Sequence, residues 1–144
     1  MNPILRVIAK IHTTIYHRSK GRFGNQMGGT QILLLHHVGA KSGKKYTTPL
    51  GYINNNQEAG GAYIIVAAAA GQPKNPGWYY NLKKNPNTTI EIMGEQINVT
   101  AEVVSGEKRN KIWNQMSADF PQFIEFQKKT SRVIPIVLLH THST

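Results

Sequence analysis

Three lysines and two glycines crowd one short stretch of the chain. Gly39 and Gly43 allow backbone conformations that point successive N–H groups at one spot. Lys41, Lys44 and Lys45 stand beside them, so backbone amides and ammonium groups together indicate a concavity for an anion such as phosphate or carboxylate. The alternative is a solvated basic hairpin tip. A phosphate-binding P-loop is excluded, because three residues rather than four separate the glycines and Lys45 stands where Ser or Thr is needed.

The chain lacks the usual side chains for chemistry of its own. It has no cysteine, which excludes disulfides, thiolate nucleophiles and cysteine-based metal sites. His36 and His37 fall on a predicted strand, where successive side chains point to opposite faces, so we expect one buried and one exposed histidine and no shared metal. No two carboxylates are placed for paired acid–base work. These features indicate a reaction whose chemistry is supplied by a bound cofactor.

Charge is the strongest global feature of the sequence. The 144 residues carry a formal net charge of +10, and the first acidic residue is Glu58. The expected partner is therefore anionic: a phosphorylated cofactor, an acidic membrane surface or nucleic acid. Nucleic acid is the least favoured of the three, because Trp78, Trp113 and most phenylalanines fall in apolar-periodic segments rather than among the lysines.

The first residues predict a basic amphipathic helix, which either packs on its own domain or rests on an anionic membrane surface. Its apolar residues recur at helical spacing: Ile4, Leu5, Ile8, Ile11 and Ile15. The sequence shows no signal peptide and no apolar run near the roughly 20 residues that span a bilayer. We therefore expect a cytoplasmic protein whose N-terminal helix is the candidate for peripheral contact with the inner face of the cell membrane.

Apolar and alternating runs predict a mainly β chain with short helices. Hairpin connections and few crossover helices indicate a six-stranded closed or split antiparallel β-barrel. We expect one barrel domain over residues 31–144, preceded by the helix and a glycine-rich linker over residues 1–30. The predicted strands cover residues 31–38, 46–53, 62–70, 88–93, 96–104 and 133–139. Other expected elements are a turn at Gly94-Glu95 and helices from Pro76, from Ser105 to about Met116, and after Pro121.

Two further patterns are candidates for a ligand site. A run of four alanines ends the third predicted strand, where small side chains either leave room beside the backbone or fill space next to a bulky neighbour. Phe120, Phe123 and Phe126 recur every third residue, which places three rings near one face of a helical turn. Core packing is one interpretation of these rings. Pro121 between them favours a short, bent element that covers a pocket.

Several separate motifs, in order, resemble the deazaflavin-dependent nitroreductase and quinone reductase family. The match covers roughly residues 32–139, and the order of the motifs is more specific than any one of them. The matching residues are Leu33-Leu34-Leu35, Gly39-Ala40-Lys41-Ser42-Gly43, Thr48-Pro49-Leu50, Val66-Ala67-Ala68, the run from Asn75 to Pro86, and Arg132-Val133-Ile134-Pro135-Ile136.

The resemblance implies a split β-barrel of the FMN-binding type that binds the reduced deazaflavin coenzyme F-420. It implies that the basic glycine loop holds the phosphate and acidic tail of the coenzyme, and that the following strand and the alanines lie along its ring. The implied cofactor-binding residues are Lys41, Ser42, Lys44, Lys45, Tyr46, Thr47, Thr48, Pro49, Leu50, Ala68, Ala69, Ala70, Asn75, Pro76, Trp78 and Tyr79. Phe120, Phe123 and Phe126 match aromatic residues on the substrate side of the family.

The sequence departs from the family pattern at a few of these positions. Members often carry basic residues where Ala40 and Tyr46 stand, and several carry Ser-Lys where Ala69-Ala70 stand. The substrate-side aromatics are often tyrosines elsewhere, and here all three are phenylalanines. FMN, FAD or another planar ligand in the same barrel is therefore the alternative to F-420.

The resemblance implies an oxidoreductase that passes a hydride from reduced coenzyme F-420 to a small planar acceptor such as a quinone or a nitroaromatic compound. No residue of the chain is expected to act as a nucleophile, a metal ligand or a paired acid and base. The chain would position two rings and exclude water.

Overall fold

The computed structural model describes residues 26–27, 30–54 and 56–142. The predicted N-terminal helix and most of the glycine-rich linker lie outside these ranges, so the division at residue 30 stays a prediction. Within them, seven strands form one sheet. The strands are β1 (Gln26–Met27), β2 (Thr30–Val38), β3 (Lys45–Tyr52), β4 (Tyr63–Val66), β5 (Asn87–Ile92), β6 (Glu95–Val103) and β7 (Ile136–Thr141). The helices are α2 (Gly77–Lys84), α3 (Gly106–Asp119) and α4 (Gln122–Lys128), with 3-10 turns η1 (Gln57–Ala59) and η2 (Ala69–Gly71).

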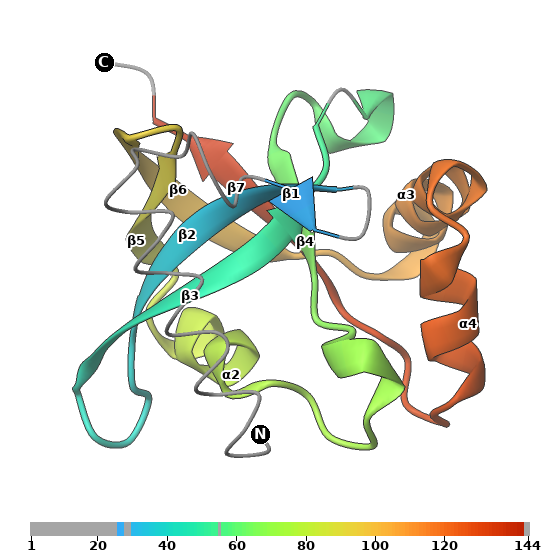
Figure 1. Ribbon diagram of the computed structural model, residues 1–144, viewed down its shortest axis with the longest axis horizontal. Coiled ribbons are helices and arrows are strands. Elements are labelled where there is room, and N and C mark those ends of the chain that lie inside the picture. Colours follow the sequence, from blue (N-terminus) through green and yellow to red (C-terminus); the bar gives the residue numbers. More distant parts are fainter. Residues whose placement is uncertain (1–25, 28–29, 55, 143–144) are drawn as a thin grey trace.

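The six longer strands curl into a split antiparallel barrel, as the sequence predicts. Neighbouring strands run in the order β3, β2, β5, β6, β7 and β4, and every pair is antiparallel. An isolated bridge between Ile53 and Ile64 joins the two ends of this row, with N···O distances of 3.0 and 2.8 Å. In the described part of the chain, β3 pairs with β2 along one edge only, so the barrel is open between β3 and β4 (Figure 1).

Side chains that alternate along the strands fill two apolar clusters. Inside the barrel, Leu33 and Leu35 of β2 meet Val137 and Leu139 of β7. The helix α2 closes one end of this interior with Trp78, Tyr79 and Leu82, all buried. The alternate residues of β4 and β7, which are Ile64, Ile136 and Leu138, face the other way. They pack against Ile112 and Met116 of α3. Helix α2 is therefore fixed by the barrel core, and α3 by its outer face.

Most strand boundaries differ from the predicted ones by one or two residues, and two differ by more. The third strand ends at Val66 rather than residue 70, and β7 begins at Ile136 rather than residue 133. One residue explains both: Ala67 N donates to Pro135 O at 2.9 Å, but Pro135 has no N–H to return, so the β4–β7 ladder stops there. The β5–β6 turn is Met93-Gly94, not Gly94-Glu95, with φ of 50° and 83°, the two positive values of a type I′ hairpin.

The helical predictions agree more closely. Helix α2 follows Pro76, and α4 follows Pro121, as expected. Helix α3 follows Ser105 but continues three residues beyond the predicted end at Met116, to Asp119. Ser105 occupies the N-cap position with an extended backbone, yet its side chain makes no capping hydrogen bond. Among the described residues, no helix has the length and apolarity that crossing a membrane requires.

Gly71 of η2 gives a direct test of how tightly α4 packs on this turn. A Cβ at Gly71 would lie 2.7 Å from Phe126 O and 2.8 Å from Lys129 Cβ, in a backbone with φ of +79°. Gly60 has a similar φ of +64°, but a Cβ there would meet no atom within 4 Å, which makes it the matched control. We expect Gly60→Ala to lower the free energy of unfolding by about 1–2 kcal/mol. Gly71→Ala should cost about 1–3 kcal/mol more, because it adds overpacking. Equal losses in urea denaturation of the two variants would contradict this close packing.

Candidate active site

The basic loop that joins β2 to β3 has a defined backbone. Gly39 N donates to Lys44 O at 2.8 Å, and Gly43 N donates to Gly39 O at 3.0 Å. Gly43 adopts φ of +70°, a conformation that favours glycine. Ser42 Oγ accepts a hydrogen bond from Lys44 N at 3.2 Å, while Lys41, Ser42, Lys44 and Lys45 are all exposed. The predicted anion-binding residues therefore share one short, ordered hairpin tip.

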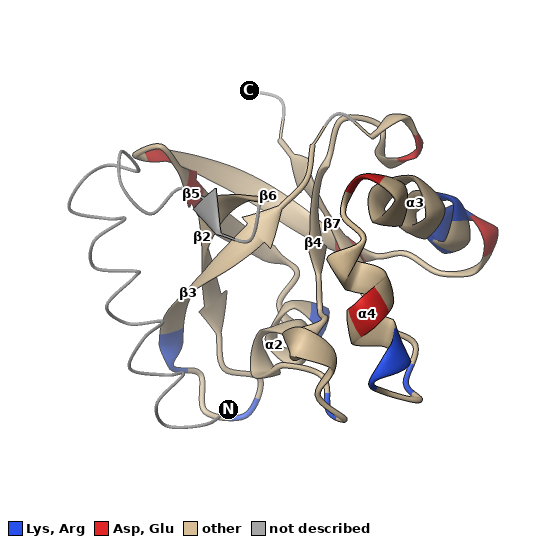
Figure 2. Cartoon of the chain, turned by 45° about the vertical axis from the view of Figure 1, so that its right-hand side comes forward, with Lys and Arg blue, Asp and Glu red and all other residues tan. Residues whose placement is uncertain are grey.

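No carboxylate compensates these lysines in the described part of the chain. The ion pairs there are Lys108 with Glu102, Lys128 with Glu125, and His140 with Glu102, all away from the hairpin. Figure 2 shows basic residues at the β2–β3 tip and beside α2 without acidic residues next to them, whereas α3 and α4 carry residues of both signs. Uncompensated like charges repel one another, so this tip gains by binding an anion.

Helix α2 holds the same loop by both polar groups of one residue. Ala40 N donates to Asn81 Oδ1 at 2.9 Å, and Ala40 O accepts from Lys84 Nζ at 2.7 Å. Asn81 and Lys84 lie three residues apart on one helix, so they share a face. Both belong to the matching run from Asn75 to Pro86, but their local sequence predicts no role for them. Lys84 also adds a fourth ammonium group beside the loop.

A buried histidine connects α2 to β3. His37 Nδ1 lies 2.9 Å from Asn81 Nδ2, and His37 Nε2 lies 2.8 Å from Thr48 Oγ1. Tyr46 stacks on the imidazole with ring centroids 5.5 Å apart. Burial, with a smaller contribution from neighbouring His36, lowers the pKa of His37 to about 4, so the ring is neutral at neutral pH. His36 points to the opposite face, half-buried, with Nδ1 3.0 Å from Thr47 Oγ1.

The alanine run forms a strained turn rather than the end of a strand. Ala69 and Ala70 have φ of 46° and 52°, and Gly71 follows at 79°. Left-handed backbone costs roughly 1–2 kcal/mol for each alanine, so surrounding contacts must hold this turn. Ala68 is buried, whereas Ala70 is exposed.

Arg132 supplies the contacts that hold the strained turn. Its guanidinium donates to four oxygens: Ala67 O at 3.0 Å, Ala68 O at 2.7 Å, Gln72 O at 3.0 Å and Asn75 Oδ1 at 2.7 Å. Only arginine offers donors in such a fork. Arg132 belongs to one of the motifs that match the family, but its local sequence predicts no role for it. A lone arginine before a proline-containing strand carries no local signal of partners that lie about sixty residues away.

The start of α2 lies between the basic β2–β3 loop and the alanine turn (Figure 1). Pro76 is at its N-cap position and Asn75 accepts from Arg132. Trp78 and Tyr79 are only 6% and 9% exposed and belong to the barrel interior. Their side chains therefore mainly pack in the barrel core, and only a small part of their surface is accessible to a ligand.

The three phenylalanines form a continuous row of rings, as their spacing predicts. Phe123 lies between Phe120 and Phe126, with centroid distances of 6.4 and 6.2 Å, and Trp113 of α3 lies 6.4 Å from it. All three phenylalanines are half-buried. Helix α4 packs against η2 through the backbone of Phe126 and the side chain of Lys129, so the row adjoins the alanine turn. Phe123 also packs on the apolar cluster beneath α3.

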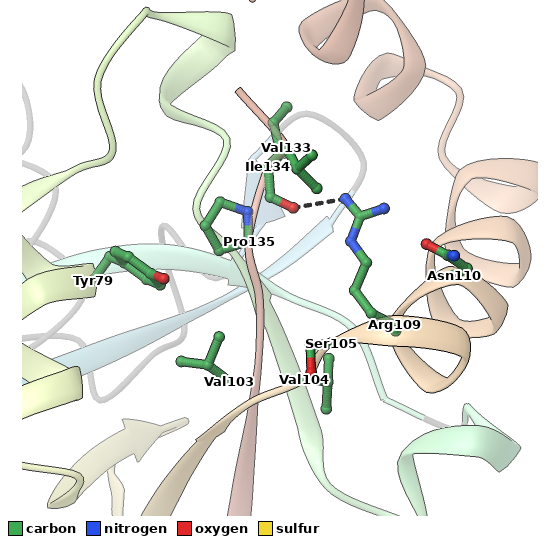
Figure 3. Close-up of a pocket in the computed structure, with 10 residues that line it drawn as sticks. Tyr79, Val103, Val104, Ser105, Arg109, Asn110, Val133, Ile134 and Pro135 are labelled. Carbon is green, nitrogen blue, oxygen red and sulfur yellow. Dashed lines mark hydrogen bonds between the residues drawn. The ribbon is translucent and has the colours of Figure 1, made fainter. Parts of the chain in front are cut away.

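A separate pocket of about 280 Å³ lies where α3 begins (Figure 3). It is lined by Tyr79, Val103–Gly106, Arg109, Asn110 and Val133–Pro135. Arg109 points across it, donates from Nη2 to Ile134 O at 2.7 Å and lies over the Trp113 ring. Tyr79 is the single predicted site residue among its lining. The pocket is therefore distinct from the basic loop and from the phenylalanine row.

Comparisons with known proteins identify the family of the chain. The model of the F420H(2)-dependent quinone reductase family matches residues 8–141. An F420H(2)-dependent quinone reductase of Mycobacterium tuberculosis is 37% identical over 138 residues, which covers 92% of this chain and 89% of that protein.

Two solved structures are also similar. One, an F420-H2 dependent reductase, is 36% identical with a TM-score of 0.64, over 76% of this chain and 93% of that one. Another, described as a domain-swapped dimer, is 31% identical with a TM-score of 0.68, over 96% of this chain and 100% of that one. By the family model and by relatives that match over most of its length, the chain belongs to the F420H(2)-dependent quinone reductase family, a family of oxidoreductases whose cofactor is coenzyme F-420.

Proposed function

We propose that this protein transfers a hydride from reduced coenzyme F-420 to a quinone. The observation that carries the proposal is the basic β2–β3 loop, which has no compensating carboxylate among the described residues and is held rigidly by α2. A preformed loop loses little conformational entropy when an anionic ligand binds. Coenzyme F-420 is anionic through its phosphate and acidic tail, so its charge fits the loop.

The residues present fit the coenzyme in three places. Lys41, Ser42, Lys44 and Lys45 would hold the phosphate and the acidic tail, with Lys84 as an additional cation. The edge of β3, residues 46–50, that has no partner strand among the described residues would lie along the ring. The alanine turn, Ala68 to Ala70, and the Asn75-Pro76 start of α2 with Trp78 and Tyr79 would border the ring from the other side. When bound, the reduced coenzyme supplies the hydride.

The chain itself positions and shields the reactants. Phe120, Phe123 and Phe126 would provide an apolar wall for a planar acceptor, adjoining the alanine turn. Phenylalanine has no hydroxyl, so this wall orients an acceptor and excludes water but donates no proton. The proton required after hydride transfer then comes from water or another group.

Replacing Lys41, Lys44 and Lys45 together by Ala tests the anion-binding role. Each charge-assisted contact is worth about 1.5–3 kcal/mol, so we expect the Kd for F-420 to rise by about two orders of magnitude or more. Added salt should weaken binding to the wild type more than to the variant. The control variant replaces Lys108, Lys111 and Lys128, exposed lysines of α3 and α4. Unchanged F-420 affinity in the folded loop variant, measured by fluorescence titration, would refute the assignment.

Phe126→Ala tests the acceptor wall. Phe126 is preferable to Phe123, because Phe123 also packs on the core cluster and its truncation would destabilise the fold. Aromatic stacking is worth about 0.5–1.5 kcal/mol per pair, so we expect KM for a menadione-like quinone to rise about threefold to tenfold, with the Kd for F-420 nearly unchanged. Ile124→Ala, on the exposed side of the same helix, is the control. Equal losses of coenzyme and quinone affinity would place Phe126 beside the coenzyme or in the core rather than at the acceptor.

We also propose that nitroaromatic compounds and other activated planar acceptors can replace the quinone, because an apolar wall selects for flatness rather than for a particular polar group. A steady-state survey of quinones and nitroaromatics with reduced F-420 tests this breadth. Parallel absorption titrations with FMN and FAD test the alternative cofactors. Tighter binding of FMN or FAD than of F-420 would overturn the coenzyme assignment.

We further propose peripheral contact with an anionic membrane through residues 1–20, on the basis of their basic amphipathic pattern. Deleting these residues should abolish co-sedimentation with vesicles of anionic lipid, and salt should weaken the binding of the full chain. Turnover of a water-soluble acceptor should largely survive the deletion. Vesicle binding that persists in the deletion variant would refute this role.

A further inference from the structure

Four polar groups from β2, β3, α2 and the basic loop form one continuous chain of hydrogen bonds. Its members are Ala40 N–H, the amide of Asn81, the imidazole of His37 and the hydroxyl of Thr48, with heavy-atom distances of 2.9, 2.9 and 2.8 Å. His37 is buried, and Thr48 and Asn81 are half-buried. The chain thus runs from the loop to the strand that borders the proposed ring site.

The first member fixes the direction of every later bond. Ala40 N–H is a donor, so Asn81 must present Oδ1 to it and its NH₂ group to His37. His37 Nδ1 must then accept, which places the ring proton on Nε2. Nε2–H donates to Thr48 Oγ1. The Thr48 hydroxyl proton must therefore point elsewhere, and the residues that the structure describes offer no acceptor for it.

We propose that His37 and Asn81 are positioning residues that orient the Thr48 hydroxyl so that it donates its proton to the bound deazaflavin coenzyme. The inference rests on the proposed function for the identity of that acceptor. The side-chain amide of Asn81 would then act at both ends of the coenzyme. It fixes the loop that binds the phosphate, and through His37 it sets the direction of the Thr48 hydroxyl beside the ring.

The surroundings of His37 keep its ring neutral and the chain intact. Charged and titratable neighbours are His36 on the same strand, Lys45 and the stacked Tyr46 on β3, and Lys84 on α2. Glu91 of β5 stands opposite Leu34, so it lies on the other face of the sheet. The pKa of about 4 lies below the usual 6.5, so the folded state binds fewer protons than the unfolded state in that window. Stability should therefore fall as pH drops from 6.5 toward 4.

Asn81→Asp tests the direction of the chain. The carboxylate still accepts from Ala40 N–H, but it now demands a proton on His37 Nδ1 and raises the pKa of the ring. While His37 is a cation, Nε2–H remains and Thr48 keeps its orientation. Above that raised pKa, Nε2 becomes an acceptor, Thr48 turns its proton toward it, and the coenzyme loses a donor. The Kd for F-420 should then weaken about tenfold as pH rises between about 5.5 and 8.5, the effect of one hydrogen bond.

Asn85→Asp is the matched control for the added charge. Asn85 follows α2 directly, is exposed and lies outside the hydrogen-bonded chain. The quantity to measure is the ratio of the two Kd values at each pH, because the titration of the coenzyme cancels in it. We expect the ratio to rise with pH. The double variant Asn81→Asp/His37→Gln should give a flat ratio, because it has no titrating ring.

Nitrogen NMR of the coenzyme-free protein gives an independent measurement. His37 should show the Nε2–H form in the wild type and the Nδ1–H form in Asn81→Asp above its raised pKa. A wild-type Nδ1–H form, or a Kd ratio independent of pH, would overturn the inference while leaving the proposed function standing. Failure of the wild type to bind F-420 would instead overturn the proposed function, and with it the acceptor assigned to Thr48.

Discussion

The two hydrogen bonds between side chains of α2 and the backbone N–H and C=O of Ala40 are the contacts on which the arrangement of the site depends. A glycine-rich loop with several lysines tends to be mobile, and its charges repel one another. Here both the N–H and the C=O of Ala40 are bound by side chains of one helix. That helix is itself anchored by Trp78, Tyr79 and Leu82 in the barrel interior. Burial of apolar side chains at the end of the barrel therefore fixes the helix whose polar side chains hold a charged surface loop.

A second set of hydrogen bonds from a distant side chain holds the backbone at the other border of the site, and we call each of the two sets a clamp. The guanidinium of Arg132 binds four oxygens of the segment between Ala67 and Asn75, and so offsets the cost of two left-handed alanines. In both clamps the polar side chain comes from a distant element and the bound group is mostly backbone. Side chains with little chemistry of their own, such as Ala69 and Ala70, are thus held in fixed positions by residues outside the site.

Local patterns in the sequence were sufficient for the barrel and for most of the proposed site. Alternating apolar residues predicted the strands, Pro76 and Pro121 marked two helix starts, and the spacing of Phe120, Phe123 and Phe126 predicted a contiguous row. Pairing was harder to predict. The end of β4 at Val66 depends on a proline just before β7, and the roles of Arg132 and Lys84 depend on partners brought close only by folding. Such information is not contained in any short window of the chain.

Two ladders border the opening of the barrel, and β5 and β6 connect them around its closed side. The β2–β3 ladder forms one wall and the β4–β7 ladder the other, and in the described part of the chain Ile53 and Ile64 make the bridge between them. Each wall keeps its own full set of backbone hydrogen bonds whatever the spacing between the walls. Widening of the opening therefore breaks the Ile53–Ile64 bridge first and leaves both ladders paired. The amide hydrogens of Ile53 and Ile64 should exchange with solvent at the rate of this local opening, whereas those deep in each ladder exchange through unfolding.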